Sequence, residues 1–97
     1  MKYQIALSPQ AQLDIELVFD YIAIDNPIKA QKFINEIINK IETLEIYPNA
    51  GKVDTVNNCR VLVKRPYLIY YRVLDNLAKV EIIHIRHGAR QMFLGQF

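Results

Sequence analysis

Apolar residues recur along the first half of the chain with the period of one strand and then of two helices. Residues 3–8 alternate apolar and polar side chains, as a half-buried strand does. Residues 9–24 and 27–46 repeat their apolar positions every three or four residues, as amphipathic helices do. Ser8 and Asn26 each precede a proline, which is the pattern of a side-chain cap followed by proline in the first helical turn. The short connection between the two helices predicts an antiparallel helical hairpin.

The first helix carries an apolar stripe too wide for one neighbour. Four residues fall on one side of it and four more lie beside them: Leu13, Leu17, Tyr21 and Ile24, then Ala11, Ile15, Val18 and Ile22. A stripe of this width needs two partners, such as a sheet and a second helix. We therefore expect the first helix to pack against both a sheet and the second helix.

The second half of the chain is predicted to form three strands. They span residues 59–64, 67–74 and 79–87, where β-branched and aromatic residues are frequent. Residues 52–58 are mostly polar and are expected to be a loop, and residues 75–78 are a plausible hairpin turn. The three strands are expected to form a meander.

Counting chain directions gives the expected topology. A helical hairpin returns the chain to the end where it left the first strand, so the next strand is expected to run antiparallel to the first. The first strand can then pair in antiparallel fashion with residues 59–64 or with residues 79–87. The apolar centre of residues 79–87 favours the second choice, because interior strands are apolar on both sides. The predicted fold class is α+β, in the order strand–helix–helix–strand–strand–strand, with an antiparallel sheet and the helical hairpin packed on one face. Residues 1–97 are expected to be one domain.

Composition narrows the class of protein. Of the 97 residues, 52% are hydrophobic, which argues against intrinsic disorder. No apolar run is long enough to cross a membrane, and the first residues lack the apolar stretch of a signal peptide. The single cysteine, Cys59, is interpreted as a small strand hydrophobe in a reducing, cytoplasmic protein. We expect no membrane partner.

Charge is distributed unevenly between the two halves. The net charge is +2, but residues 1–50 hold four Lys or Arg against seven Asp or Glu, and residues 51–97 hold eight against three. A basic half suits an anionic partner, either a phosphate or an acidic peptide. The alternative is that arginines on exposed strands serve solubility and protect the sheet edge.

The more polar side of each strand is expected to face solvent, away from the helices. This open side would carry Arg60, Lys64, Tyr70 and Arg72, with Arg86 or His87 and Arg90 at the rim. Arginine beside tyrosine suits phosphate and base contacts, although plain exposed sheets carry the same combination. The candidate residues for binding a target or a phosphate are therefore Arg60, Arg72, Arg86 and Arg90.

The two histidines do not suggest a metal site. His84 and His87 stand three apart on one strand, so they are expected to point to opposite faces, and no carboxylate or cysteine stands at ligand spacing. His84 is expected to pack with the buried half of the strand. His87 precedes a glycine and is available as an acid or base near neutral pH. We expect no metal and no cofactor.

Short motifs in a fixed order run through almost the whole chain. They are Ser8-Pro9 with Ala11 and Asp14, Tyr21-Ile22 before Asn26-Pro27, Ala30 with Phe33 and Ile34, Leu44 with Pro48 and Gly51, Arg60, the run from Pro66 to Val73, and the ending from Ile85 to Arg90. This set resembles the RelE/ParE toxin superfamily of bacterial type II toxin–antitoxin systems. The resemblance implies a single RelE/ParE-like toxin domain over residues 1–97.

The resemblance also implies one of two activities. RelE-like members cut messenger RNA on the ribosome with cationic and tyrosine side chains, whereas ParE-like members are described as poisons of DNA gyrase. Leu68 stands where the nuclease members carry a catalytic arginine, and residues 91–97 contain no tyrosine. Only Arg90 matches a nuclease arginine. These departures favour the ParE-like branch, because a missing charge-stabilising group typically costs about 10²–10³-fold in rate.

Two alternatives stay open. One is a ribosome-dependent ribonuclease that uses a rearranged set of His87, Arg90, Tyr70 and Lys64, with the ribosome and mRNA as partners. The other is a non-toxic binding domain of the same fold.

The resemblance further implies a cognate antitoxin, ParD-like or RelB-like, as well as the gyrase target. We expect it to be acidic, partly disordered and encoded beside this gene, and to lie along the helical hairpin or on the open sheet. The apolar tail residues Met92, Phe93, Leu94 and Phe97 are expected to fold back on the sheet, or alternatively to dock a partner.

Overall fold

The two helices form the expected hairpin. The computed structural model describes residues 2–89 and opens with strand β1 (Gln4–Leu7), helix α1 (Pro9–Ala23) and helix α2 (Pro27–Glu42). Both predicted caps are confirmed, because the Ser8 side chain accepts the backbone N–H of Ala11 and the Asn26 side chain accepts that of Lys29, each at 3.0 Å. α2 ends earlier than predicted, and its last turn tightens into a 3₁₀ helix, η1 (Thr43–Glu45).

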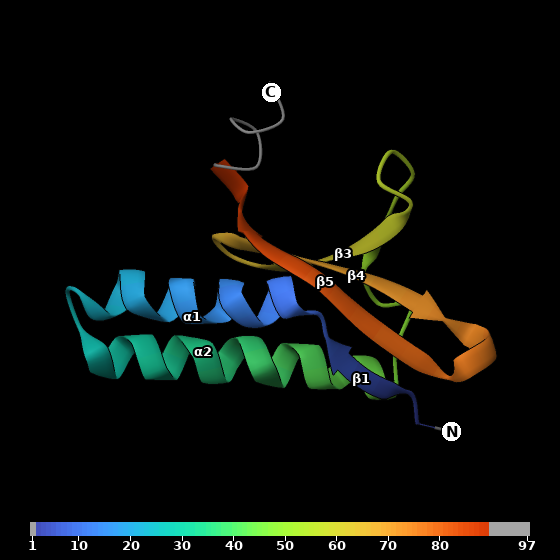
Figure 1. Cartoon of the computed structure of the whole chain (residues 1–97), viewed down its shortest axis with the longest axis horizontal. Coiled ribbons are helices and arrows are strands. Elements are labelled where there is room, and N and C mark those ends of the chain that lie inside the picture. The colour runs from blue at the N-terminus through green and yellow to red at the C-terminus, as the bar shows by residue number, and fades with distance from the viewer. Residues whose placement is uncertain (1, 90–97) are drawn as a thin grey trace.

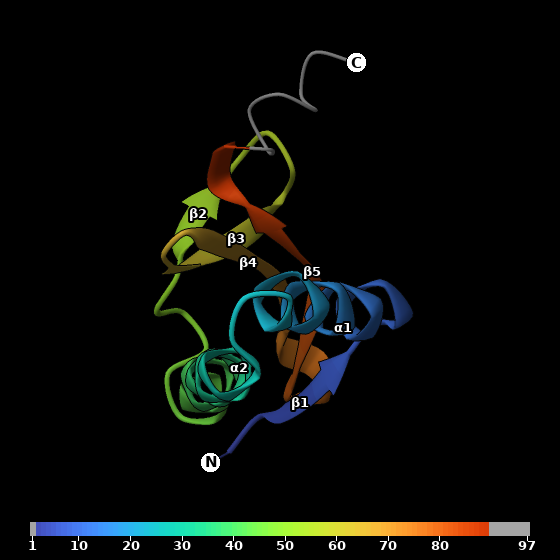
Figure 2. The same ribbon diagram turned by 90° about the vertical axis from the view of Figure 1, so that its left-hand side faces the viewer.

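The four strands after the hairpin join β1 in a five-stranded sheet. They are β2 (Lys52–Asp54), β3 (Cys59–Lys64), β4 (Tyr67–Leu74) and β5 (Lys79–His87), with a short 3₁₀ turn, η2 (Asp75–Leu77), between the last two. The strand order is β1-β5-β4-β3-β2. α1 and α2 lie side by side on one face of this sheet (Figure 1), and the view along the helices in Figure 2 shows the two layers. The predicted α+β class and the hairpin packed on one face are confirmed.

The sheet is mixed, which corrects the prediction of a wholly antiparallel sheet. β1 pairs with β5, as favoured from the sequence, but the two strands run parallel, with Gln4 opposite Lys79 and Leu7 opposite Ile82. The cause is the short strand β2, which was predicted to be loop. β2 runs antiparallel to β1, as expected of the strand after the hairpin, but this extra strand reverses the direction of every strand that follows it.

The core lies between the hairpin and the sheet. Its largest fully buried side chains come from α2, η1, β4 and β5: Tyr71, Ile37, Leu44, Ile69, Ile82 and Val80. Burying an aliphatic side chain of this size contributes about 1.5–3 kcal/mol relative to leaving it in water. This layer fixes which side of each strand faces the helices.

α1 has the two expected partners, the helix α2 and the sheet strand β5, but one side of its apolar stripe stays exposed. Leu13, Leu17, Tyr21 and Ile24 are 47%, 55%, 59% and 82% exposed. α1 packs on α2 and β5 through its other apolar positions, among them Ala11 and Val18. The stripe is therefore half core and half surface.

A β-bulge changes the facing of the end of β5. Tyr71 is opposite Ile82, but the preceding residue of β4, Tyr70, is opposite His84, so Ile83 is an extra residue on β5. The bulge moves His84 to the side of the sheet away from the helices, beside Tyr70. The expectation that His84 packs with the buried half was wrong for this reason.

Within the described residues, no helix combines the length and apolar character needed to cross a membrane.

Candidate functional site

The predicted cationic residues do not share one face. Arg60 is opposite the fully buried Tyr71, and Lys64 is opposite Tyr67 of the core, so both lie on the side of the sheet that faces the helices. The prediction that they lie on the open face was wrong. Each of these cations has a polar partner on this side, loop carbonyl oxygens for Arg60 and the Glu36 carboxylate of α2 for Lys64.

Arg60 holds the loop that joins η1 to β2. Its guanidinium donates to the carbonyl oxygens of Gly51 at 2.9 Å and Asn49 at 3.2 Å. The Tyr71 hydroxyl reinforces the same loop, because it accepts the Gly51 N–H and donates to the Pro48 carbonyl, each at 2.8 Å. The role of Arg60 is therefore to hold this loop through its backbone carbonyl groups.

We predict that Arg60→Ala reduces stability and does not reduce target binding directly. Hydrogen bonds to a charged donor contribute about 1.5–3 kcal/mol, so a loss in this range is expected for the free energy of unfolding. Urea unfolding followed by circular dichroism measures it, with the exposed Arg65→Ala as the control. A stable Arg60→Ala protein that has lost its target would contradict this role.

Lys64 is tied to α2. Its ammonium lies 3.0 Å from a Glu36 carboxylate oxygen and 5.5 Å from the centre of the Phe33 ring. These contacts fasten the end of β3 to the helix layer.

The open face, the side of the sheet away from the helices, carries Tyr70, Arg72, His84 and Arg86. The Tyr70 and His84 rings pack with centroids 4.6 Å apart, and Tyr70 is only 5% exposed. Burial raises the pKa of the Tyr70 hydroxyl. Burial, aided by the nearby Arg86 charge, lowers the pKa of His84, although Asp14 opposes this shift. Both rings are therefore uncharged at neutral pH.

The two arginines of this face differ in their surroundings. Arg72 lies 3.7 Å from Glu81 and is half exposed. Arg86 is partly buried, and its Nε is enclosed without a hydrogen-bond partner among residues 2–89. A buried guanidinium nitrogen of this kind is costly unless an acceptor arrives. Arg86 therefore has an enclosed donor whose hydrogen bond is not satisfied within the described residues.

The four groups proposed for a nuclease do not converge. Tyr70 lies on the open face, whereas Lys64 and His87 lie on the helix side. Arg90 and the tail residues 91–97 are outside the described residues. General acid–base chemistry needs its groups within hydrogen-bond reach of one substrate. The described members of the set cannot meet this condition together.

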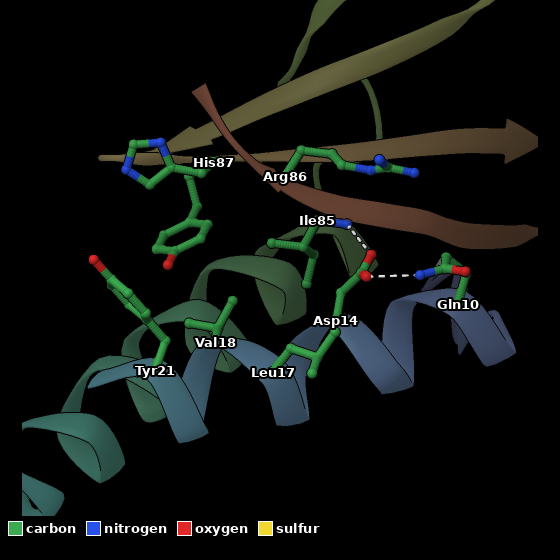
Figure 3. Close-up of a pocket in the computed structure, with 9 residues that line it drawn as sticks. Gln10, Asp14, Leu17, Val18, Tyr21, Ile85, Arg86 and His87 are labelled. Atoms are coloured by element: carbon green, nitrogen blue, oxygen red, sulfur yellow. Dashed lines mark hydrogen bonds between the residues drawn. The ribbon is translucent and has the colours of Figure 1, made fainter. Parts of the chain in front are cut away.

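A groove lies at the edge of β5, beside α1. β1 ends at Leu7, opposite Ile82, so residues 83–87 of β5 continue without a strand on that side; we call them the β5 edge. α1 runs beside this edge and provides Asp14, whose carboxylate accepts the Ile85 N–H at 2.9 Å and the Gln10 side-chain amide at 2.8 Å (Figure 3). The Ser8 hydroxyl donates to the Ile83 carbonyl at 2.6 Å.

Two adjoining cavities form the groove. The first, of about 280 Å³, lies between α1 and the β5 edge; the second, of about 440 Å³, continues between α1, α2 and the start of β4. They share Tyr21, Tyr67 and His87. The His87 ring stands edge-on to Tyr67 at 5.3 Å, and its Nδ1 accepts the Ala89 N–H at 3.2 Å.

Asp14 is the site residue that the sequence analysis placed only in a motif. Its side chain is 8% exposed and bonds to the β5 edge. This edge is unpaired because β1 ends at Leu7, opposite Ile82. The position of Asp14, three residues after Ala11 and four before Val18, puts it on the buried stripe of α1, which is the signal that indicates its role. In the described part of the chain, no three His, Cys, Asp or Glu side chains gather as a metal site requires.

The sequence as a whole matches a known family. Residues 5–92 match the family described as the ParE toxin of the type II toxin–antitoxin system parDE. The chain belongs to the ParE toxin family. It is also 33% identical over 87 residues to the protein named Toxin RelE2 of Caulobacter vibrioides, covering 90% of this chain and 97% of that protein.

Solved structures agree on the fold of this ParE-family chain. A chain of the chromosomal ParDE system from P. aeruginosa aligns with a TM-score of 0.76 and 23% identity, over 89% of this chain and 96% of that one. A chain of the RelBE2 toxin–antitoxin complex from Mycobacterium tuberculosis aligns with a TM-score of 0.68 and 16% identity, over 90% and 99%. The predicted superfamily is confirmed.

Leu68 lies on the open face of this ParE-family chain. It is opposite Val63 on β3 and Arg86 on β5. An apolar side chain here can neither donate a proton nor stabilise charge on a phosphate. The position expected to hold an arginine in the nuclease branch is therefore chemically inert in this protein.

Proposed function

We propose that this ParE-family toxin inhibits DNA gyrase by binding and has no nuclease activity of its own. The observation that supports this proposal is the separation of Tyr70 from Lys64 and His87 on opposite faces, with Leu68 beside Arg86. A binding poison needs a shaped, charged surface but no converging acid and base. We propose Arg72, Arg86 and Arg90 as target-binding residues, and assign Arg60 to the loop.

A RelE-like activity is the second candidate. The identity of 33% to a protein named Toxin RelE2 favours it. In that case the chain would cleave mRNA on the ribosome with groups other than the separated set.

The two activities are distinguished by parallel assays on one purified preparation. The wild-type chain is expressed under tight control, and growth, gyrase supercoiling in vitro and cleavage of ribosome-bound mRNA are measured. We expect growth arrest and loss of supercoiling, because within residues 2–89 Leu68 and the separated groups do not assemble a cleavage site. Arg72→Ala is expected to weaken gyrase inhibition, since Arg72 is the most exposed arginine of the open face.

Each other outcome identifies an alternative. Cleavage of mRNA with normal supercoiling would replace the gyrase proposal by the RelE-like one. No growth arrest, with neither activity, would leave a non-toxic binding domain.

We also propose that a cognate antitoxin, ParD-like or RelB-like, neutralises the chain. The similar solved structures come from a ParDE system and a RelBE2 complex, which supports a partner of this kind. The gene beside this one is expected to encode an acidic protein that copurifies with the chain and restores growth.

A further inference from the structure

We propose that two copies of this chain associate through the free edge of β2, which pairs with itself in antiparallel fashion about a two-fold axis at Val53. β2 is the last strand in the order β1-β5-β4-β3-β2, so one of its sides has no neighbouring strand among the described residues. Its three residues, Lys52-Val53-Asp54, are basic, apolar and acidic in turn. This inference goes beyond the proposed function and does not depend on it.

The direction of the Val53 backbone groups follows from the hydrogen-bond ladders of the sheet. Residues opposite each other in an antiparallel pair of strands alternate between pairs that exchange two hydrogen bonds and pairs that exchange none. Ile85 directs its N–H to Asp14, away from β4, so Ile85 and Ile69 exchange none. Ile69 therefore directs its N–H and C=O to β3, where it is opposite Leu62.

The same alternation continues to the edge of the sheet. On β3, Leu62 and Arg60 direct their backbone groups to β4, and Val61 directs its groups to β2. Val61 is opposite Lys52, and Arg60 is opposite Val53. Val53 therefore directs its N–H and C=O to the free side of β2. Consistently, no backbone hydrogen bond outside the β2–β3 ladder involves Val53 within residues 2–89.

The side chains of β2 are complementary to a second copy of themselves. Antiparallel pairing centred on Val53 puts Val53 opposite Val53 of the second copy, where the two residues exchange backbone hydrogen bonds. Lys52 of each copy is then opposite Asp54 of the other. Opposite charges at such positions, with Cβ atoms about 4.5–5.5 Å apart, stabilise the pairing of strands. Centring the pair on Lys52 or on Asp54 would instead oppose like charges, so the charge pattern selects the register at Val53.

Both charges are available to a second copy. Lys52 is exposed and forms no ion pair within residues 2–89. The Asp54 carboxylate accepts the Asn57 side-chain amide at 2.8 Å and the N–H groups of Asn57 at 3.2 Å and Val56 at 3.1 Å. These bonds, led by that of the Asn57 side chain, lower the pKa of Asp54 and hold its carboxylate in place. A carboxylate has about four acceptor sites, so one remains for Lys52 of the second copy.

The paired sheet would leave the groove uncovered and align the two open faces. β2 lies at the edge of the sheet away from β1 and α1 (Figure 2), so pairing there leaves the β5 edge free. A two-fold axis between antiparallel strands of one sheet is perpendicular to that sheet. Both helical hairpins therefore lie on one side, and Arg72 and Arg86 of both copies lie on the other. A target with two equivalent sites would bind this surface with an avidity that one copy lacks.

The test is the mass of the purified full chain in solution, measured by analytical ultracentrifugation over a series of concentrations. The weight-average mass is expected to rise with concentration above 11.3 kDa, the mass of one chain. Lys52→Glu is expected to weaken association at least about 10-fold, because both facing pairs then oppose like charges. Lys40→Glu makes the same change at an exposed position of α2 and is expected to associate like wild type.

Val53→Pro tests the backbone contact directly. Proline removes the N–H on the free side of β2 and none of the hydrogen bonds between β2 and β3, and edge strands tolerate this. The variant is expected to keep the wild-type circular dichroism spectrum and to stay monomeric where the wild type associates. In the wild type, hydrogen exchange at the Val53 amide is expected to slow as the concentration rises. If Val53→Pro does not fold, this exchange and the Lys52→Glu result decide the question.

Two results would overturn the inference. A mass of one chain at every concentration would mean that the short, charged strand β2 only protects the edge of the sheet. An association that Lys52→Glu leaves unchanged, or that does not slow exchange at Val53, would assign the contact to another surface, such as the exposed side of α1. Neither result bears on gyrase inhibition or on antitoxin binding, which are measured in separate assays.

Discussion

Replacing Asp14 by alanine is expected to lower the free energy of unfolding by about 2–3 kcal/mol. The carboxylate is buried and accepts the Ile85 N–H at 2.9 Å, at the place where β1 no longer covers β5. Alanine would leave that N–H without a partner beside the groove and would release the Gln10 amide. Urea unfolding followed by far-ultraviolet circular dichroism measures the change.

Two variants separate the hydrogen bond from other effects of removing an acid. Asp20→Ala removes a carboxylate from an exposed position of the same helix and is expected to change stability by less than about 0.5 kcal/mol. Asp14→Asn keeps an oxygen that can accept the Ile85 N–H, so its loss is expected to be smaller than that of alanine. Equal stability of Asp14→Ala and Asp20→Ala would show that the strand edge does not need the carboxylate.

The elements that followed from the sequence are those with a long, regular pattern and a clear interruption. β3, β4 and β5 begin and end at the predicted residues, because Arg65-Pro66 and the turn at 75–78 interrupt three runs of six to nine residues. β2 was missed because it has three residues, of which only Val53 is apolar, and that side chain is 62% exposed. β2 is a strand because it pairs with β3, and this pairing cannot be predicted from the residues of β2 alone.

The faces of the sheet were harder to predict than the strands. The polarity of Arg60 and Lys64 suggested that their side chains face solvent. Each instead has a partner on the helix side, loop carbonyl oxygens for Arg60 and the Glu36 carboxylate for Lys64. The bulge at Ile83 then reversed the facing of His84, and a bulge has no fixed signature in a strand that lacks glycine, as β5 does. A one-residue change of register moves every later side chain to the other face. Site predictions that depend on strand parity are therefore less secure than the strands themselves.

The groove could not be predicted from the sequence for a related reason. It depends on where β1 stops relative to β5, which is a property of two segments far apart in the chain. The exposed side of α1 was visible in the sequence as surplus apolar width, but the sequence did not show which half would remain uncovered. The structure places that half beside the β5 edge, with Tyr21 in both cavities.

Gly51→Ala is expected to destabilise the chain by about 2–3 kcal/mol, at the upper end of the usual effect of overpacking. A Cβ at this position would lie 2.8 Å from the Tyr71 hydroxyl and 2.8 Å from the Val61 carbonyl oxygen. The carbonyl belongs to β3 and cannot move without disturbing the sheet. The hydroxyl cannot move without losing the Gly51 and Pro48 hydrogen bonds. Thermal and urea unfolding both measure the loss.

Gly88→Ala is the matched control, because its Cβ would lie 3.4 Å from the nearest atom, the Pro66 carbonyl oxygen. This variant is expected to be neutral, or stabilised by up to about 1 kcal/mol through reduced freedom of the unfolded chain. Tyr71→Phe removes the hydroxyl but leaves the Val61 carbonyl and the ring carbon Cε1, which is also 2.8 Å from the added Cβ, so Gly51→Ala should cost less in a Tyr71→Phe background while remaining destabilising. An unchanged cost in that background would assign the clash to the ring carbon and β3, and a neutral Gly51→Ala in the wild-type background would contradict the close approach of the loop to Tyr71.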